Sequence, residues 1–140
     1  MSQRPATLLG FDHGEKKIGI AVGQGVTGTA SPLLVLTVQK RRPDWSTISK
    51  LIETWQPDAL VVGLPLDRDG GEQPASRAAR RFREQLVGRF GIPVHMVDER
   101  YSSLEARQQL TERGMPSVED DAVAAQIILE SWLREKGNDS

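Results

Sequence analysis

The chain has 140 residues and a formal net charge of −1, which is the length of one ordinary domain. It contains no cysteine, which excludes disulfides, zinc–thiolate sites and thiol catalysis. No apolar stretch reaches the roughly 18–20 residues that span a bilayer, and the N-terminus lacks the hydrophobic region of a secretory signal. We therefore expect a single cytoplasmic domain over residues 1–140 without membrane contact. Binding to nucleic acid would have to use a local basic patch, because the whole chain is not basic.

The first half of the chain begins with short runs rich in Leu, Ile and Val. These runs predict strands at Thr7–Phe11, Ile18–Gly23 and Leu33–Val38. The short connections between them favour an antiparallel meander. Residues 43–57 then predict a helix that Asp44 caps and Pro57 ends.

The second half alternates strands and helices. Strands are predicted at residues 59–65 and 92–99, with a long polar helix over 72–90 between them, and helices over 102–114 and from 117 to about 136. Strands that are reached through helices favour parallel pairing. The predicted fold class is therefore α/β, with a mixed five-stranded sheet of three antiparallel strands and then two parallel ones, flanked by helices.

Three carboxylates fall at the ends of predicted elements. Asp12 follows the first strand, Glu99 ends the last strand, and Asp121 begins the last helix. Alternation along the last strand puts His95, Val97 and Glu99 on one face and Val94, Met96 and Asp98 on the other. Open α/β sheets bind ligands at the carboxyl ends of their strands. Converging carboxylates repel one another unless a hard divalent cation such as Mg²⁺ offsets the charge.

Each of these acids also has a purely structural interpretation. Asp12 suits a turn, Glu99 could pair with Arg100, and Asp121 could cap a helix against its dipole. For the stretch around Asp12 taken alone, an ordinary β-hairpin is as good an interpretation as a catalytic site. The sequence favours the hypothesis that all three acids meet at one site.

Four segments in a fixed order carry a resemblance to a known family. They are "GFDHGEKKIGIAVG", "VVGLPLDRDGGEQP", "VDERYSSLEA" and "DDAVAAQIILESWL". Together they resemble the YqgF family, also called RuvX, whose members are small bacterial proteins of the RNase H-like superfamily. The resemblance covers residues 8 to 133. It implies an RNase H-like fold and a nuclease similar to Holliday junction resolvases that matures the 5′ end of precursor 16S rRNA during ribosome biogenesis.

The resemblance also implies a catalytic site. The family's acids correspond to Asp12, Glu99 and Asp121, which would be both the catalytic residues and the ligands of Mg²⁺ or Mn²⁺. One metal ion would activate a water molecule for attack on phosphorus, and a second would stabilise the departing 3′ oxygen. The products would carry a 5′ phosphate and a 3′ hydroxyl.

Substrate binding is predicted for four basic residues, which are Lys16, Arg100, Arg77 and Arg81. Arg77 and Arg81 lie at i and i+4 on the long polar helix and form the best candidate patch for a phosphate backbone. A solvated helix face is the alternative interpretation. The three tryptophans, Trp45, Trp55 and Trp132, are expected in the core, and His13 and His95 receive no role.

Alternative functions remain open. A sugar-kinase or actin-like ATPase would need a second lobe, and no Gly-Lys-Ser/Thr phosphate loop is present. A non-catalytic regulator of transcription or translation would bind nucleic acid without cutting it. A Holliday junction resolvase needs a stable dimer, and no apolar surface helix indicates one, so we expect a monomer or weak homodimer. An RNA precursor is thus favoured over a DNA junction as the partner, with ribosomal particles as further partners.

Overall fold

The computed structural model describes residues 7–25, 27–40, 42–67, 69–98 and 120–138, without the side chains of residues 120, 121 and 135–138. The expected helix over 102–114 lies outside these residues, as do Glu99 and Arg100. The strands are β1 (Thr7–His13), β2 (Lys17–Gln24), β3 (Thr29–Thr37), β4 (Ala59–Leu64) and β5 (Val94–Asp98). The helices are α1 (Trp45–Trp55), α2 (Pro74–Phe90) and α4 (Asp120–Asn138).

The five strands form one mixed sheet in the order β3-β2-β1-β4-β5. β1 pairs antiparallel with β2, and β2 pairs antiparallel with β3. β4 pairs parallel with β1 on one side and with β5 on the other. The predicted sheet is therefore confirmed. Its consequence for the site is that the carboxyl ends of β1, β4 and β5 lie at the same edge.

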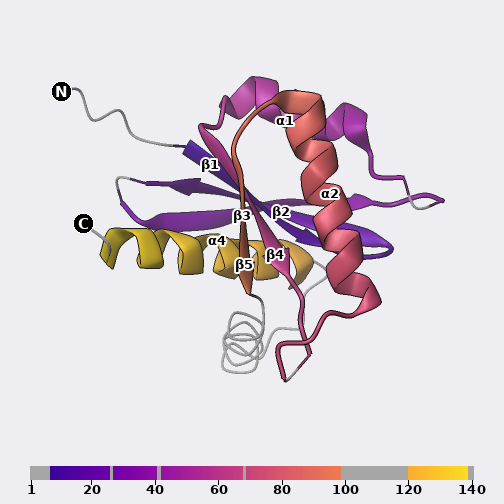
Figure 1. Cartoon of the computed structure of the whole chain (residues 1–140). Coiled ribbons are helices and arrows are strands. Elements are labelled where there is room, and N and C mark those ends of the chain that lie inside the picture. The colour runs from indigo at the N-terminus through magenta and orange to yellow at the C-terminus, as the bar shows by residue number, and fades with distance from the viewer. Residues whose placement is uncertain (1–6, 26, 41, 68, 99–119, 139–140) are drawn as a thin grey trace.

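Helices cover both faces of the sheet, with α1 and α2 on one face and α4 on the other (Figure 1). The first core joins Leu9, Phe11, Leu60 and Val62 to Ile48 and Phe82 of the helices. The second core joins Leu8, Ala21 and Val61 to Ala125 and Leu129 of α4. Each of the buried Leu, Ile, Val and Phe side chains among these contributes about 1.5–3 kcal/mol by leaving water. Side chains along β1 thus alternate between the two faces, with Leu9 and Phe11 toward α1 and α2 and Leu8 toward α4.

Three strands extend further than predicted, of which β2 gains one residue at each end. β1 continues through Asp12 to His13, because Asp12 still pairs with Gly19 and His13 with Ile18. β3 begins at Thr29 and not at Leu33, and its pairing with β2 shifts register between Ile20 and Ala21. β5 begins at Val94, two residues after the start of the predicted strand over 92–99.

Asp44 caps α1 as predicted. Its Oδ1 accepts a hydrogen bond from the Thr47 backbone N–H at 3.2 Å, and its Oδ2 accepts one from the Thr47 hydroxyl at 2.8 Å. These hydrogen bonds lower the pKa of the Asp44 carboxyl.

We expect Asp44→Ala to lower the thermal unfolding midpoint by a few degrees, because the first turn of α1 loses its hydrogen-bond acceptor. Asp44→Asn keeps a side-chain acceptor and should unfold near the wild-type midpoint. Equal midpoints for the two variants would show that this cap adds nothing to stability.

Candidate active site

Asp12 lies near the carboxyl end of β1, in the middle of the sheet. It is half-buried and pairs with Gly19 of β2. Leu8 and Gly10, which precede it at two-residue spacing, contact α4. Because strand side chains alternate, Asp12 lies on the α4 face of the sheet. Its neighbour His13 lies on the α2 face, where its ring centroid is 4.8 Å from that of Phe82.

α4 runs antiparallel to β1. Gly23 of β2 pairs with Leu8, near the start of β1. A Cβ added to Gly23 would meet Leu129 and Leu133 of α4, while one added to Gly10 would meet Leu129 and Ala125. Moving along β1 toward Asp12 therefore means moving along α4 toward its first residue. Position 121 comes four residues before Ala125, one helical turn earlier on the same side of α4. The first turn of α4 thus lies at the end of the sheet where Asp12 lies.

The absence of side chains at Gly10 and Gly23 permits this arrangement. A Cβ on Gly10 would lie 3.0 Å from Leu129 Cβ and 3.1 Å from the Ala125 carbonyl oxygen. A Cβ on Gly23 would lie 2.7 Å from Leu129 Cδ2. Both glycines pack directly under α4, and the helix can approach the sheet closely only because they have no side chain.

The structure places Asp98 of the last strand on the face of the sheet opposite to Asp12. On β5, Val94 and Met96 pack with the α2-side core, and Asp98 shares their face by alternation. His95 and Val97 lie on the α4 face. Asp98 is therefore on the opposite face from Asp12, as the predicted alternation requires if Glu99 is the acid of the site. Glu99 itself lies outside the described residues, so its role stays a prediction.

The donors at this edge fit a hard cation. Asp12 offers carboxylate oxygens on the α4 face, and a carboxylate at position 121 would be of the same kind. Mg²⁺ and Mn²⁺ prefer oxygen ligands of this type. Among the residues that the structure describes, no three His, Cys, Asp or Glu side chains form a group that could hold a metal ion. A complete ligand set would need Glu99 and the Asp121 side chain, which are not among them.

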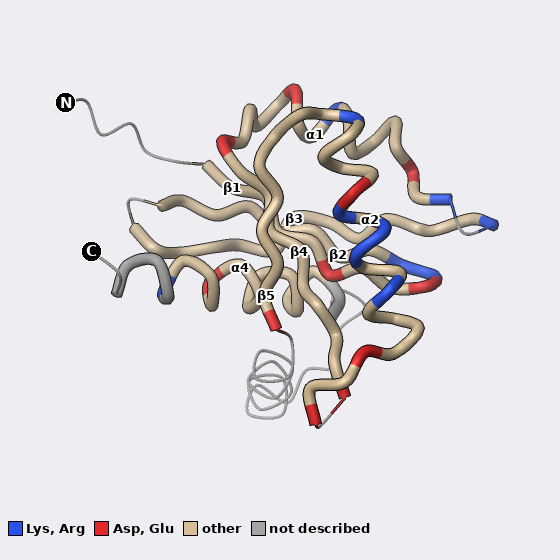
Figure 2. Tube along the Cα trace, in the orientation of Figure 1, with Lys and Arg blue, Asp and Glu red and all other residues tan. Residues whose placement is uncertain are grey.

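Three of the four predicted basic residues are among those that the structure describes, one in the β1–β2 turn and two on α2. Lys16 is exposed in the turn between β1 and β2, and Arg77 and Arg81 are exposed on α2. Figure 2 shows Lys and Arg along α2 and at the β1–β2 turn. Arg81 lies near enough to His13 for its charge to help lower the pKa of that imidazole, although burial is the larger cause. The charge of Arg81, on the basic face of α2 that Arg77 and Arg81 form, therefore acts on His13, the residue next to Asp12. Arg100 lies outside the described residues.

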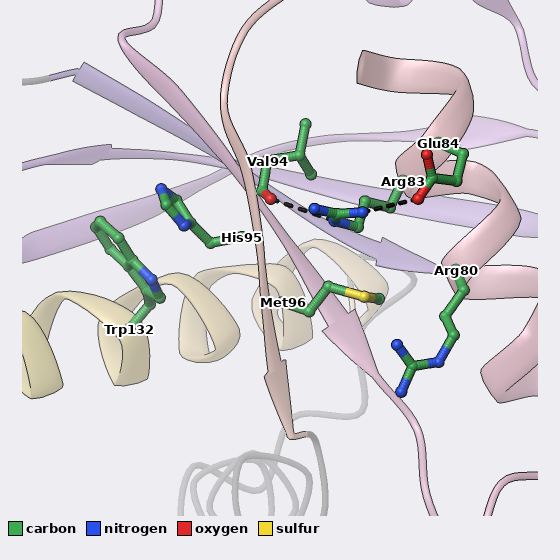
Figure 3. A pocket seen from close by; sticks show the side chains of 7 residues that line it. All are labelled: Arg80, Arg83, Glu84, Val94, His95, Met96 and Trp132. Carbon is green, nitrogen blue, oxygen red and sulfur yellow. Dashed lines mark hydrogen bonds and ion pairs between the residues drawn. The ribbon is translucent and has the colours of Figure 1, made fainter. Parts of the chain in front are cut away.

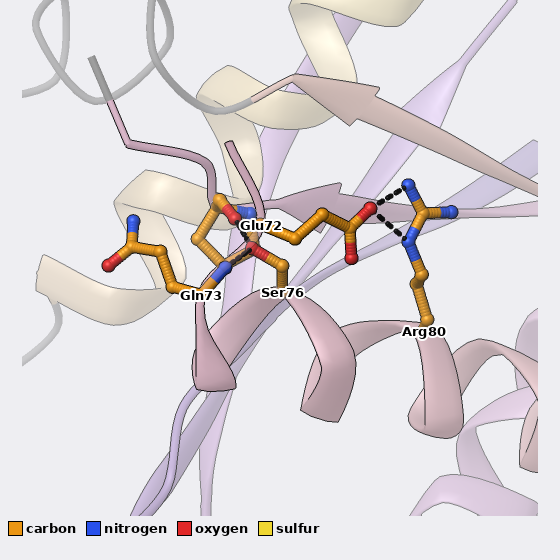
Figure 4. A network of polar contacts seen from close by, with 5 residues as sticks. Glu72, Gln73, Ser76 and Arg80 are labelled. Atoms are coloured by element: carbon orange, nitrogen blue, oxygen red, sulfur yellow. Dashed lines mark hydrogen bonds and ion pairs between the residues drawn. The ribbon is translucent and has the colours of Figure 1, made fainter. Parts of the chain in front are cut away.

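The loop after β4 is fixed to the start of α2 by polar contacts that sequence reasoning missed. The fully buried Ser76 hydroxyl donates to the Pro65 carbonyl and accepts a hydrogen bond from the Gln73 backbone N–H at 3.0 Å (Figure 4). Asp67 Oδ1 accepts hydrogen bonds from Asp69 N–H at 2.9 Å and Gly71 N–H at 2.7 Å. This loop follows the carboxyl end of β4, which pairs parallel with β1. The contacts therefore fix the backbone at the end of the sheet where Asp12 lies. The sequence signal for these contacts was Ser76, the third residue of α2, which caps the start of the helix together with Gln73.

Comparison with known proteins assigns the family. The family model described as "RuvX: Holliday junction resolvase" matches residues 6–135. The chain belongs to the RuvX family. Two relatives named "Putative pre-16S rRNA nuclease" cover nearly all of this RuvX chain. The one from Pectobacterium carotovorum subsp. carotovorum (strain PC1) is 52% identical over 131 residues, which is 91% of this chain and 94% of the relative. The one from Yersinia pestis (strain Pestoides F) is 50% identical over 134 residues, or 93% and 96%.

Solved structures confirm the fold of the RuvX chain. Thermus thermophilus RuvC, in complex with a Holliday junction substrate, superposes with a TM-score of 0.59 at 18% identity and covers 95% of this chain and 96% of its own. The fowlpox virus resolvase with junction DNA gives 0.55 at 12% identity and covers 93% and 98%. At such identities the likeness carries the fold alone. The RNase H-like sheet that the resemblance implied is thus confirmed for this RuvX chain, and its catalytic residues remain predictions.

Proposed function

We propose that this chain is a Mg²⁺- or Mn²⁺-dependent nuclease that processes the 5′ end of precursor 16S rRNA. Membership of the RuvX family makes it a nuclease, a hydrolase of phosphodiester bonds. The rRNA substrate is proposed because relatives of about half-identical sequence carry that name. Nucleic acid is accordingly its main partner, with ribosomal particles and a cytoplasmic location following from the same proposal. In the described part of the chain, none of the helices is both long and apolar enough to cross a membrane.

One structural observation carries the proposal. Asp12 lies on the face of the sheet that α4 covers, at the end where α4 begins, and Gly10 lets the helix approach closely. Asp12, Glu99 and Asp121 would hold the metal through carboxylate oxygens. A bound divalent ion would supply an activated water molecule and stabilise charge on the leaving oxygen. Asp12 would orient that ion. Its backbone is held in β1 by the pairing with Gly19, and its half-buried side chain has little freedom to move.

Calorimetric titration with Mn²⁺ tests the ligand set. Wild-type protein is expected to bind Mn²⁺, and a triple Asp12→Asn, Glu99→Gln, Asp121→Asn variant is expected to show no measurable binding, because each change removes a charged oxygen ligand of nearly unchanged volume. Thermal unfolding of the variant checks that it still folds. Equal Mn²⁺ affinity in both proteins would contradict the assignment of these residues.

The basic face of α2 is proposed to hold the phosphate backbone. Replacing both Arg77 and Arg81 by Ala should weaken RNA binding and reduce its dependence on salt, because arginines release counterions when they neutralise phosphates. The rate of cleavage by RNA-saturated enzyme should stay close to that of the wild type. Binding measured across a series of salt concentrations checks this. An unchanged salt dependence would mean that this face is merely solvated.

The resolvase function of structurally similar proteins is the second candidate, favoured by the name of the family model and by the fold. A resolvase cuts two strands symmetrically and therefore acts as a dimer. Sedimentation of the protein with and without a four-way DNA junction distinguishes the two functions. A stable dimer on the junction would favour the resolvase, and a monomer that binds RNA would favour rRNA processing.

A further inference from the structure

The outer edge of β5 carries a pocket of about 610 Å³. β5 is the last strand in the sheet order, so none of the other described strands pairs with this edge. Figure 3 shows His95 and Trp132 on one side of the strand and Arg80, Arg83 and Met96 on the other. The pocket thus presents rings on one wall and guanidinium groups on the other, with the strand between them.

The aromatic wall is a stacked pair from two different elements. His95 of β5 and Trp132 of α4 have ring centroids 4.9 Å apart and planes inclined by 26°. Trp132 packs against the α4-side core, which agrees with the expected core position, yet it also lines the pocket. Both side chains are half-buried. A ring held by a core on one side and reaching a pocket on the other resembles the aromatic platforms on which unpaired bases stack.

The cationic wall is held in place by weak surface pairs. Arg83 Nη1 lies 2.8 Å from Glu84 Oε1, and Arg80 Nε donates to Glu72 Oε2 at 2.8 Å. The side chains of both pairs are at least one third exposed. Exposed ion pairs of this kind contribute little free energy because water screens them. A phosphate that enters the pocket can therefore replace the glutamates as the partner of either arginine.

A hydrogen bond at the strand edge argues against a protein strand as the occupant. Arg83 Nε donates to the Val94 carbonyl oxygen at 3.3 Å. A strand added to β5 would pair with main-chain groups along this edge, and the arginine already takes one of them. The same contact fixes the position of the Arg83 guanidinium, which lines the pocket and would bind a phosphate there.

We propose that this pocket binds one nucleotide of a single-stranded RNA, with its base on the His95–Trp132 pair and its phosphate at Arg80 and Arg83. The proposal rests on the proposed function, which supplies the polynucleotide. His95 is paired with Val61, which is paired in turn with Gly10, two residues before Asp12. The pocket is therefore two strands away from the candidate active site, and an RNA strand held at Asp12 can extend into it.

Binding of a fluorescein-labelled single-stranded oligouridine, measured by anisotropy in EDTA to prevent hydrolysis, tests the proposal. Trp132→Leu should weaken binding about tenfold, since stacking of one base contributes roughly 1–3 kcal/mol. Trp132→Phe should stay close to wild type because it keeps a ring. Trp55→Phe is the matched control, since Trp55 packs against the core on the other face of the sheet. It should not change binding.

Two further measurements keep the result interpretable if Trp132→Leu is poorly folded. RNA should quench tryptophan fluorescence in the wild type and in Trp55→Phe, and the quenching should be lost in Trp132→Phe. His95→Leu should weaken binding in the same way as Trp132→Leu. Wild-type binding of RNA with no effect of these changes would overturn the nucleotide pocket and leave the proposed function intact. Failure of the wild type to bind or cut any RNA would overturn both.

Discussion

Asp12→Asn is expected to abolish most of the nuclease activity while leaving the fold unchanged. The substitution keeps the size and polarity of the side chain and removes only its negative charge. The fold should survive because the half-buried position still holds a polar group and the backbone pairing with Gly19 is unaffected. Loss of a charged metal ligand should cost several kcal/mol of transition-state stabilisation, a fall in rate on the order of a thousandfold or more.

A matched variant separates this effect from a general loss of charge. Asp58→Asn makes the same chemical change at the other end of the sheet, where Asp58 Oδ2 accepts a hydrogen bond from the Thr7 backbone N–H at 3.1 Å. An asparagine can still accept that bond, so cleavage should proceed at the wild-type rate. Thermal unfolding and metal-dependent RNA cleavage are measured for both variants. A folded Asp12→Asn protein that cleaves at the wild-type rate would show that Asp12 has no catalytic role and that β1 and β2 form an ordinary β-hairpin.

Gly10→Val is expected to lower both stability and activity, although Gly10 carries no chemistry. The new side chain would collide with Leu129 Cβ and with the Ala125 carbonyl, and the latter is main chain that cannot rotate away. Overpacking of this kind costs about 1–3 kcal/mol. The strain should be relieved by movement of α4 away from β1, which would carry position 121 away from Asp12. Mn²⁺ affinity should therefore fall together with the unfolding free energy.

Gly88→Ala is the control for this glycine effect. Gly88 is in α2, and a Cβ there would meet nothing within 4 Å. Alanine in a helix should therefore raise stability by roughly 0.5–1 kcal/mol and leave metal binding unchanged. Urea unfolding and Mn²⁺ titration are compared for the two variants. Unchanged Mn²⁺ affinity in a destabilised Gly10→Val protein would separate the packing of α4 from the metal site.

Much of the fold could be predicted because it depends on local periodicity. Apolar runs identified the strands among the described residues, the helices were predicted close to their observed bounds, and alternation correctly separated Asp98 from the face of His95 and Val97. Of the candidate site, only the place of Asp12 near the end of a strand was both predicted and observed. Its convergence with Glu99 and Asp121 depends on the path of the chain and stays a prediction.

The predicted start of β3 at Leu33 was four residues too late, and Pro32 lies within the segment that the prediction left out. A proline cannot donate to a sheet ladder, so a central strand would not tolerate it. β3 is an edge strand, and its register shifts beside Pro32, where Leu33 has no partner on β2. A bulge at a sheet edge accommodates such a residue. The position of a strand within its sheet decides this point, and one sequence does not contain that information.

The contacts between distant segments were also beyond the sequence. Gly10 and Gly23 are ordinary strand glycines until α4 is placed over them. His95 and Trp132 are 37 positions apart, and their stacking follows from the packing of α4 beside β5. A tryptophan on an apolar helix face correctly predicts a core residue, but periodicity does not show that it also reaches a pocket.

A cleavage assay with two substrates tests the central claim most directly. Purified protein is incubated with a fragment of precursor 16S rRNA or with a four-way DNA junction, each with Mg²⁺, with Mn²⁺ or with EDTA. If the chain is a metal-dependent RNA nuclease, the rRNA fragment is cut in either metal, remains intact in EDTA, and yields 5′-phosphate ends, while the junction is cut far more slowly. Cleavage of the rRNA fragment in EDTA would contradict the metal-dependent mechanism, and symmetrical cutting of the junction with intact rRNA would contradict the proposed substrate.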